Sequence, residues 1–225
     1  MKTIKIQQFK VRCSGLNDIT TNGRSSGSMG ETCKSYVKQW LIEQITGVRK
    51  EISSKEMEKG IWCEDEAIQL AGKHFGWFMP EKNTERRCND WLTGECDVVL
   101  PNSIEDIKCP YDVQTFPNFS REIPVKGYEK QLQGYMELWE KDSAGLVYVL
   151  VETPEDIDSY GTCAQPVCGY STWELSERIR RYETERDKQF IALARERVED
   201  CRVYISKELV PELEEWKKIK IEIAS

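Results

Sequence analysis

The pattern of apolar and polar positions predicts a chain in which helices and strands alternate. Apolar residues recur at helical spacing over about 32–46, where Gly47 is the expected stop, and again over about 54–74 and 128–141. The run from Ala144 to Glu152 is rich in apolar and β-branched residues and predicts a buried strand. Together these elements favour an α/β fold with a central mixed β-sheet flanked by helices.

Capping patterns predict where several helices begin. Ser28-x-x-Glu31 resembles a capping box before the first helix, and Ser171-x-x-Glu174 is expected to open a long charged helix that reaches roughly Leu209, with a break around Cys201. Four apolar residues of the helix over 54–74 are expected to face the core: Ile61, Ala67, Ile68 and Ala71. We expect one domain over 1–225, with a core of about 11–152 and a helical C-terminal part of about 171–225.

Two short strand-like runs, 93–100 and 104–109, predict an antiparallel hairpin closed around Pro101-Asn102. Cross-strand partners then have residue numbers with a constant sum, so Asp97 falls opposite Asp106. Side chains alternate between the two faces of a strand, and Asp97, Asp106 and Lys108 therefore share one face.

The chemistry of this shared face points to a metal. Two neighbouring carboxylates repel each other unless one is protonated or a cation lies between them. A hard divalent metal with oxygen ligands resolves that conflict. The ammonium of Lys108 could then stabilise a developing oxyanion or help to deprotonate water. The alternative interpretation is ordinary solvated surface charge.

Composition narrows the classes of function. The chain has 225 residues with 39% apolar residues and a net charge of -7, which counts against a binder of nucleic acid that relies on a broad basic patch. No run approaches a membrane span and the first ten residues do not resemble a signal peptide, so we expect a cytoplasmic protein. His74 is the single histidine, so histidine-based triads are excluded unless that residue serves.

The nine cysteines are odd in number and scattered, and we interpret them as free thiols. The one close pair, Cys163-x4-Cys168, does not match an ordinary zinc or iron-sulfur spacing.

Three separated blocks resemble the PD-(D/E)XK nuclease superfamily, and more specifically the phage lambda exonuclease and YqaJ-like recombination nucleases. The helical GIWCEDEA contains Glu64, GECD and EDIKCP contain Asp97, Asp106 and Lys108, and YEKQLQGYMELW contains a glutamine and two tyrosines. The resemblance spans about 11–139. Cys96 stands where a proline often precedes the first aspartate.

The resemblance implies roles for these residues. Glu64, Asp97, Asp106 and the backbone carbonyl of Ile107 would hold one or two Mg²⁺ ions, with Mn²⁺ as a substitute, and Lys108 would orient or activate the attacking water.

The third block contributes residues of one helix face. Gln131-x-x-x-Tyr135 matches the motif of the RecB-type branch, whereas Tyr128 and Gln131 match the phage exonuclease pattern. Tyr128, Gln131 and Tyr135 share one helix face at this spacing, so both patterns can hold. We expect Gln131 to be catalytic and all three residues to contact DNA.

Near the N-terminus, Ser14 matches the serine that contacts a terminal 5′ phosphate in these exonucleases. The arginine that assists it occurs earlier in the phage lambda type than any arginine here, and Arg12 is the candidate replacement.

The implied substrate is linear double-stranded DNA, degraded from the 5′ end to leave 3′ tails for a phage-type single-strand annealing protein in a bacterial host. A ring of subunits, with a trimer favoured, would supply the grip on DNA that the net acidity weakens. Alternatives are an endonuclease or a RecB-like nuclease of the CRISPR-adaptation type in the same superfamily, or a noncatalytic module that binds DNA ends.

Overall fold

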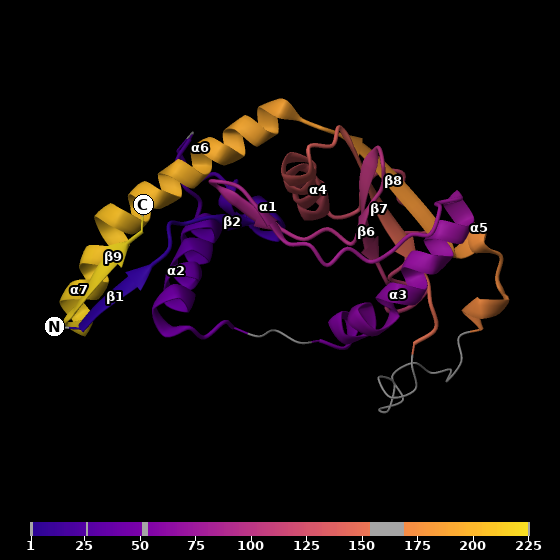
Figure 1. Ribbon diagram of the computed structural model, residues 1–225, viewed down its shortest axis with the longest axis horizontal. Coiled ribbons are helices and arrows are strands. Elements are labelled where there is room, and N and C mark those ends of the chain that lie inside the picture. The colour runs from indigo at the N-terminus through magenta and orange to yellow at the C-terminus, as the bar shows by residue number, and fades with distance from the viewer. Residues whose placement is uncertain (1, 26, 51–53, 154–168, 225) are drawn as a thin grey trace. The chain divides into compact units, whose positions relative to one another are not determined.

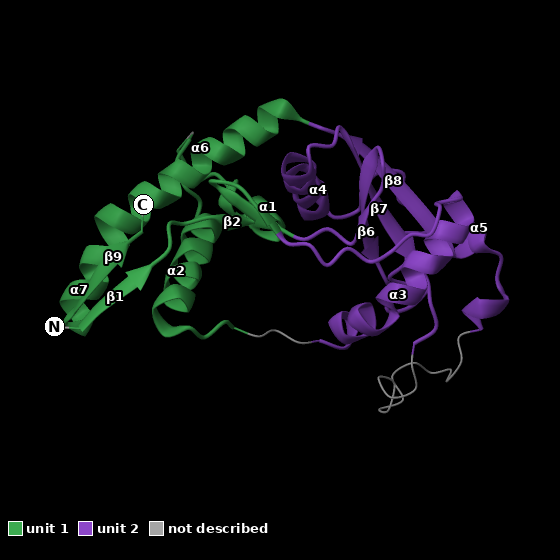
Figure 2. Cartoon of the chain, in the orientation of Figure 1, with its two compact units in different colours: residues 1–51, 87–94, 187–225 green, residues 52–86, 95–186 purple. Residues whose placement is uncertain are grey.

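The computed structural model describes residues 2–25, 27–50, 54–153 and 169–224. The chain forms two compact units, each assembled from separate stretches of sequence (Figure 2). The first contains 1–51, 87–94 and 187–225, and the second contains 52–86 and 95–186. The expected single nuclease domain over 1–225 stays a prediction. Cys163 and Cys168 lie outside the described residues.

A mixed four-stranded sheet forms the centre of the second unit. It consists of β5 (Val98–Val99), β6 (Ser103–Lys108), β7 (Ser143–Val149) and β8 (Ile179–Glu185), in that order. The β6 and β7 strands are parallel, and the other two pairs are antiparallel. The predicted α/β fold with a mixed sheet is therefore confirmed.

Helices cover both faces of this sheet (Figure 1). The longer, α3 (Lys55–Phe75), begins at Ser54, whose side chain accepts a hydrogen bond from the Met57 amide, and ends before Gly76. Its buried side chains pack with the odd-numbered strand residues Ile107 and Val147. The even-numbered face meets α4 (Lys126–Trp139), because Gln131 of that helix donates a hydrogen bond to Asp106. A short helix, α5 (Leu175–Arg178), precedes β8.

The first unit has two small sheets. In one, β1 (Lys2–Ile6) pairs in parallel with β9 (Ile219–Ile223). The other has the order β2 (Val11–Arg12), β4 (Leu92–Gly94), β3 (Arg87–Cys88).

The helices of the first unit include two of the longest in the chain. They are α1 (Leu16–Ile19), α2 (Glu31–Thr46), α6 (Lys188–Tyr204) and α7 (Val210–Lys217), and a π-helical segment, Ile205–Leu209, joins the last two. Short 3₁₀ turns occur at Cys13–Gly15 in this unit and at Tyr170–Thr172 in the second. Gly47 ends α2 in the left-handed conformation, as predicted from the sequence.

The predicted long helix from 171 to about 209 is wrong. Its first half contains the short helix α5 and then β8, which extends the central sheet, and the long helix α6 begins only at Lys188. This segment pairs antiparallel with β7 along its whole length, and its buried positions are Ile179 and Tyr182. The dense charge of β8 hid the strand.

Three smaller expectations also require correction. Gly30, not Ser28, is the N-cap of α2, and no side-chain cap is present there. The run 93–100 is divided, since its beginning belongs to β4 and its end to β5. Ile61 is 71% exposed and borders a cleft, because it lies on the helix face opposite the buried Lys59 and Cys63, whereas Ala67, Ile68 and Ala71 are buried as predicted.

In the described part of the chain, the cysteines form no disulfide bonds. Among the described residues, helices that combine the length and the apolar character needed to cross a membrane are absent.

Candidate active site

A cleft of about 480 Å³ in the second unit collects half of the residues that the sequence nominated. It is bounded by α3, the end of β6 and the loop that follows β6. The nominated residues that line it are Glu64, Asp97, Ile107, Lys108 and Tyr128. Asp106 does not line the cleft, since it is buried with 2% exposure.

The predicted pairing of Asp97 with Asp106 follows from the observed register. Val98 pairs with Glu105, and the next position outward joins Asp97 to Asp106. Asp97 Oδ2 accepts a hydrogen bond of 2.6 Å from the Ile107 amide. Burial and the neighbouring Asp106 charge raise the pKa of Asp97 well above its usual value, although Lys108 and the Ile107 amide partly oppose them. The two carboxylates therefore form a strained like-charge pair.

Lys108 supplies the first compensating charge. Its ammonium is ion-paired with Asp106 Oδ2 and lies 4.9 Å from the centre of the Tyr128 ring. Burial alone would lower the pKa of Lys108, but the carboxylates of Asp106 and Asp97 outweigh it and the pKa is raised. Lys108 is thus held as a cation beside the acids, and the predicted shared face is confirmed.

Glu64 enters the cleft from α3. Its Oε2 atom lies 2.7 Å from the Lys82 ammonium, and its charge contributes to the raised pKa of Asp97. The hydrogen bond to Glu64 in turn raises the pKa of Lys82. The helix and the hairpin therefore bring three carboxylates into one electrostatic cluster.

The predicted helix face of α4 lies against this cluster. The Gln131 amide nitrogen is 3.3 Å from Asp106 Oδ1 and 2.7 Å from the Tyr135 hydroxyl. Tyr135 is 5% exposed, so it supports Gln131 from the interior and is covered from solvent. This arrangement lets Gln131 fix the orientation of Asp106.

The donor atoms suit a hard divalent cation, since all are carboxylate oxygens and two belong to a repelling pair. In the described residues, however, no three or more His, Cys, Asp and Glu side chains are arranged to hold a metal ion. Lys82 and Lys108 are the cations that balance these carboxylates in the present arrangement. The oxygen donors of these residues therefore suit a divalent metal, and lysines are the counter-ions in the present arrangement.

Solved structures of known proteins resemble this chain. A phage-related exonuclease from Haemophilus somnus 129PT is similar to the chain with 33% identity and a TM-score of 0.83, over 92% of this chain and 97% of that one. This chain belongs to the family of phage-related exonucleases. The alkaline exonuclease LHK-Exo from Laribacter hongkongensis has the same fold, with 18% identity, a TM-score of 0.66 and coverage of 94% of this chain and 95% of that one. Its complex with dAMP gives a TM-score of 0.67, again with 18% identity, over 93% of this chain and 94% of that one. Neither a scan of protein-family models nor a search of curated proteins gave a match.

The two residues nominated for 5′-phosphate recognition in this exonuclease lie in the first unit, apart in sequence from the acids. Ser14 is exposed in a 3₁₀ turn. The Arg12 guanidinium is engaged by Glu43 at 2.7 Å, and the Arg12 amide donates to the Tyr36 hydroxyl at 3.3 Å. A phosphate would compete with Glu43 for Arg12, and the role of both residues stays a prediction.

One residue that lines the cleft of the exonuclease, Tyr148, and one that pairs with a lining residue, Lys82, were missed from the sequence. Tyr148 lines the cleft because the parallel pairing of β6 and β7 brings it opposite Lys108. Only the register of these two strands identifies Tyr148 as a cleft residue. Lys82 follows α3 in a loop, eighteen positions after Glu64 in the numbering, and no periodic pattern connects the two.

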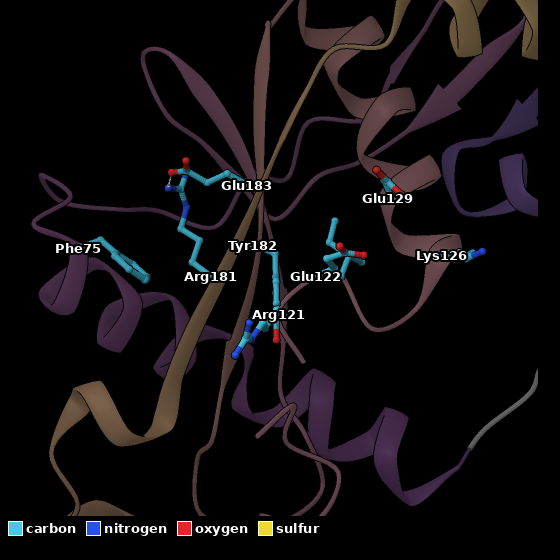
Figure 3. A pocket seen from close by; sticks show the side chains of 9 residues that line it. Phe75, Arg121, Glu122, Lys126, Glu129, Arg181, Tyr182 and Glu183 are labelled. Atoms are coloured by element: carbon cyan, nitrogen blue, oxygen red, sulfur yellow. Dashed lines mark hydrogen bonds and ion pairs between the residues drawn. The ribbon is translucent and has the colours of Figure 1, made fainter. Parts of the chain in front are cut away.

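A second hollow in this unit, of about 770 Å³, has a different character (Figure 3). Acidic and basic side chains alternate around it, and Arg181 is paired with Glu183. Lys126 and Glu129 belong to α4, and Arg121 belongs to the loop before that helix. These mixed charges do not converge on one point, so the cleft around Asp97 remains the candidate active site of the exonuclease.

Proposed function

We propose that this chain is a metal-dependent DNA exonuclease that hydrolyses linear double-stranded DNA, working from the 5′ end with Mg²⁺ and leaving 3′ single-stranded tails. The observation that carries the proposal is the buried pairing of Asp97 with Asp106 beside the Lys108 ammonium, in a chain of the phage-related exonuclease family. A repelling carboxylate pair with an adjacent lysine suits phosphodiester hydrolysis better than it suits a structural role.

Each residue of the cleft has a distinct task in this proposal. Asp97, Asp106, Glu64 and the Ile107 carbonyl would hold Mg²⁺, which supplies charge neutralisation at the phosphate and acidifies water when it is bound. The amide of Ile107 already fixes one oxygen of Asp97. Lys108, ion-paired with Asp106, would orient the attacking water or stabilise charge on a phosphate oxygen.

Residues outside the acid cluster would position the substrate. Tyr128 offers its ring to the Lys108 ammonium, which restricts where that charge can move. Gln131 restrains Asp106 through its amide, and Tyr135 restrains Gln131. Ser14 and Arg12 would bind the 5′ phosphate that defines polarity.

The same proposal includes the assembly and its setting. The net charge of -7 weakens nonspecific binding to DNA, so enclosure of the duplex by a ring of subunits, with a trimer favoured, would keep the enzyme on its substrate. The 3′ tails would pass to a single-strand annealing protein in the bacterial cytoplasm. A monomer in solution that still digests DNA processively would contradict the ring.

One gel assay tests the activity. Linear duplex with 5′ phosphate, linear duplex with 5′ hydroxyl and covalently closed circular DNA are each incubated with Mg²⁺ and with EDTA. We expect Mg²⁺-dependent loss of the phosphorylated duplex, slower loss of the hydroxyl duplex and an intact circle. Cleavage of the circle would indicate an endonuclease, and binding without hydrolysis in Mg²⁺ or Mn²⁺ would indicate a noncatalytic module.

Variants then assign the chemistry. Lys108→Ala is expected to lower the rate by about a hundredfold or more while the fold is kept, because it removes one positioned charge. Lys73→Ala, which changes an exposed lysine near the end of α3, is the matched control and should retain the activity. Normal turnover by a folded Lys108→Ala protein would refute the assignment.

A further inference from the structure

Lys82 pairs with the cleft residue Glu64, and the proposed mechanism gives it no task. Its ammonium lies 2.7 Å from Glu64 Oε2, and the charges of Asp65 and Asp97 also act on it. Its side chain is 41% exposed whereas that of Glu64 is 18% exposed. Lys82 therefore reaches from solvent to a carboxylate of α3 that lines the cleft.

The backbone around Lys82 is fixed on both sides. The carbonyl of Pro80 accepts a hydrogen bond of 3.0 Å from Gln69 of α3. The amide of Asn83 donates to the Asp97 carbonyl at 2.7 Å, and the Asn83 side chain donates to the Cys96 carbonyl at 2.8 Å. Lys82 thus stands on a short segment tied to the helix of Glu64 and to the backbone of Asp97. Its pairing with Glu64 follows from this anchoring.

Two carboxylates of the cluster are each paired with a lysine. Lys108 neutralises Asp106 from β6, and Lys82 neutralises Glu64 from α3. A carboxylate paired with an ammonium presents fewer free lone pairs to a metal. A divalent cation that takes Glu64 as a ligand repels the Lys82 ammonium on the same carboxylate, so the two cations compete for Glu64.

We propose that Lys82 is a placeholder cation that holds Glu64 while the site is metal-free and competes with the divalent ion for it. Lys82 is then a positioning residue that sets the metal concentration at which the site fills. This inference rests on the proposed metal-dependent function and adds to it the residue that regulates metal binding.

The test measures metal affinity without DNA. Titration of Mg²⁺ and Mn²⁺ into wild type and Lys82→Met, followed by calorimetry, should show about two- to sixfold tighter binding in the variant, as removal of a partly exposed ion pair predicts. Lys82→Arg should bind the metal as wild type does. Lys73→Met is the control for loss of an exposed lysine and should leave the affinity unchanged.

A second pair of variants shows whether Lys82 acts through Glu64. In Glu64→Gln the ammonium has lost its carboxylate partner, so adding Lys82→Met should change metal affinity by less than it does in wild type. Unchanged or weaker metal binding in Lys82→Met, with wild-type circular dichroism and a wild type that binds metal, would overturn the placeholder role alone. A wild type that binds neither cation would overturn the metal-dependent function and this inference with it.

Discussion

Loss of the Arg181 guanidinium is expected to destabilise the sheet that carries the active-site acids. Arg181 of β8 binds Glu105 of β6 through two hydrogen bonds of 2.9 and 2.8 Å, and the Glu105 side chain has 0% exposure. Ser103 donates a third hydrogen bond to Glu105 at 2.8 Å. Glu105 directly precedes Asp106, so this ion pair joins the two strands at the level of the active site.

The magnitude follows from these contacts. Each charge-assisted hydrogen bond contributes about 1.5–3 kcal/mol, and two together give about 3–6 kcal/mol. Removing one partner of a buried ion pair costs about 3–5 kcal/mol, because the other charge is left uncompensated. We therefore expect Arg181→Met to lower the free energy of unfolding by about 3–5 kcal/mol, and Tm by about 6–20 °C for a chain of this size.

The assay is urea denaturation followed by far-ultraviolet circular dichroism in the presence of EDTA. Arg195→Met is the matched control, because Arg195 pairs with Asp90 on the surface of the first unit with side-chain exposures of 58% and 62%. That variant should lose less than about 1 kcal/mol. The double variant Glu105→Met/Arg181→Met should recover most of the loss, since no buried charge is left behind. A cost in Arg181→Met no larger than in Arg195→Met would refute the argument.

Three further outcomes are expected. In EDTA at pH 8, Asp97→Asn should be about 1 kcal/mol more stable than wild type but inactive on DNA. Burial and Asp106 raise the folded pKa of Asp97, so protonation of Asp97 stabilises the wild-type fold fully below the unfolded pKa, and this stabilisation is lost as pH rises through the folded pKa. Thermal denaturation should therefore show the stability advantage of the variant shrinking toward pH 4. Gln131→Leu should lower kcat/KM on linear duplex by about 10–100-fold, since Asp106 loses the amide that orients it, whereas an unchanged value would remove Gln131 from the site. Gly145→Ala should cost about 1–3 kcal/mol in urea denaturation, because its Cβ would lie 1.9 Å from Glu105 Oε2, and wild-type stability would show that the pair can shift at no cost.

The sequence predicted the active-site hairpin well because its geometry is local. A turn at Pro101-Asn102 fixes the register, and the register brings Asp97 opposite Asp106 whatever the rest of the chain does. The helix of Glu64 was equally predictable, since Ser54 and Gly76 mark its two ends. Such signals depend on neighbours within a few residues.

Features that depend on residues far apart in the sequence could not be predicted. The charged segment of β8 forms a strand because β7 pairs with its backbone and Glu105 provides a partner for Arg181. The pairing of β1 with β9 joins the two ends of the chain, and no local pattern announces it. Lys82 meets Glu64 because Pro80 and Asn83 anchor the loop, which again is a tertiary effect.

The two faces of the central sheet explain why the acids can be held so close together. On one face, α3 packs apolar side chains against Ile107 and Val147, which fixes the helix that carries Glu64. On the other face, Gln131 of α4 holds Asp106. Apolar packing and the lysines around the site thus offset the repulsion between the carboxylates. The carboxylates themselves still repel one another, which is a local electrostatic frustration. A divalent cation between the carboxylates would relieve that frustration, so the feature that destabilises the cleft would favour metal binding.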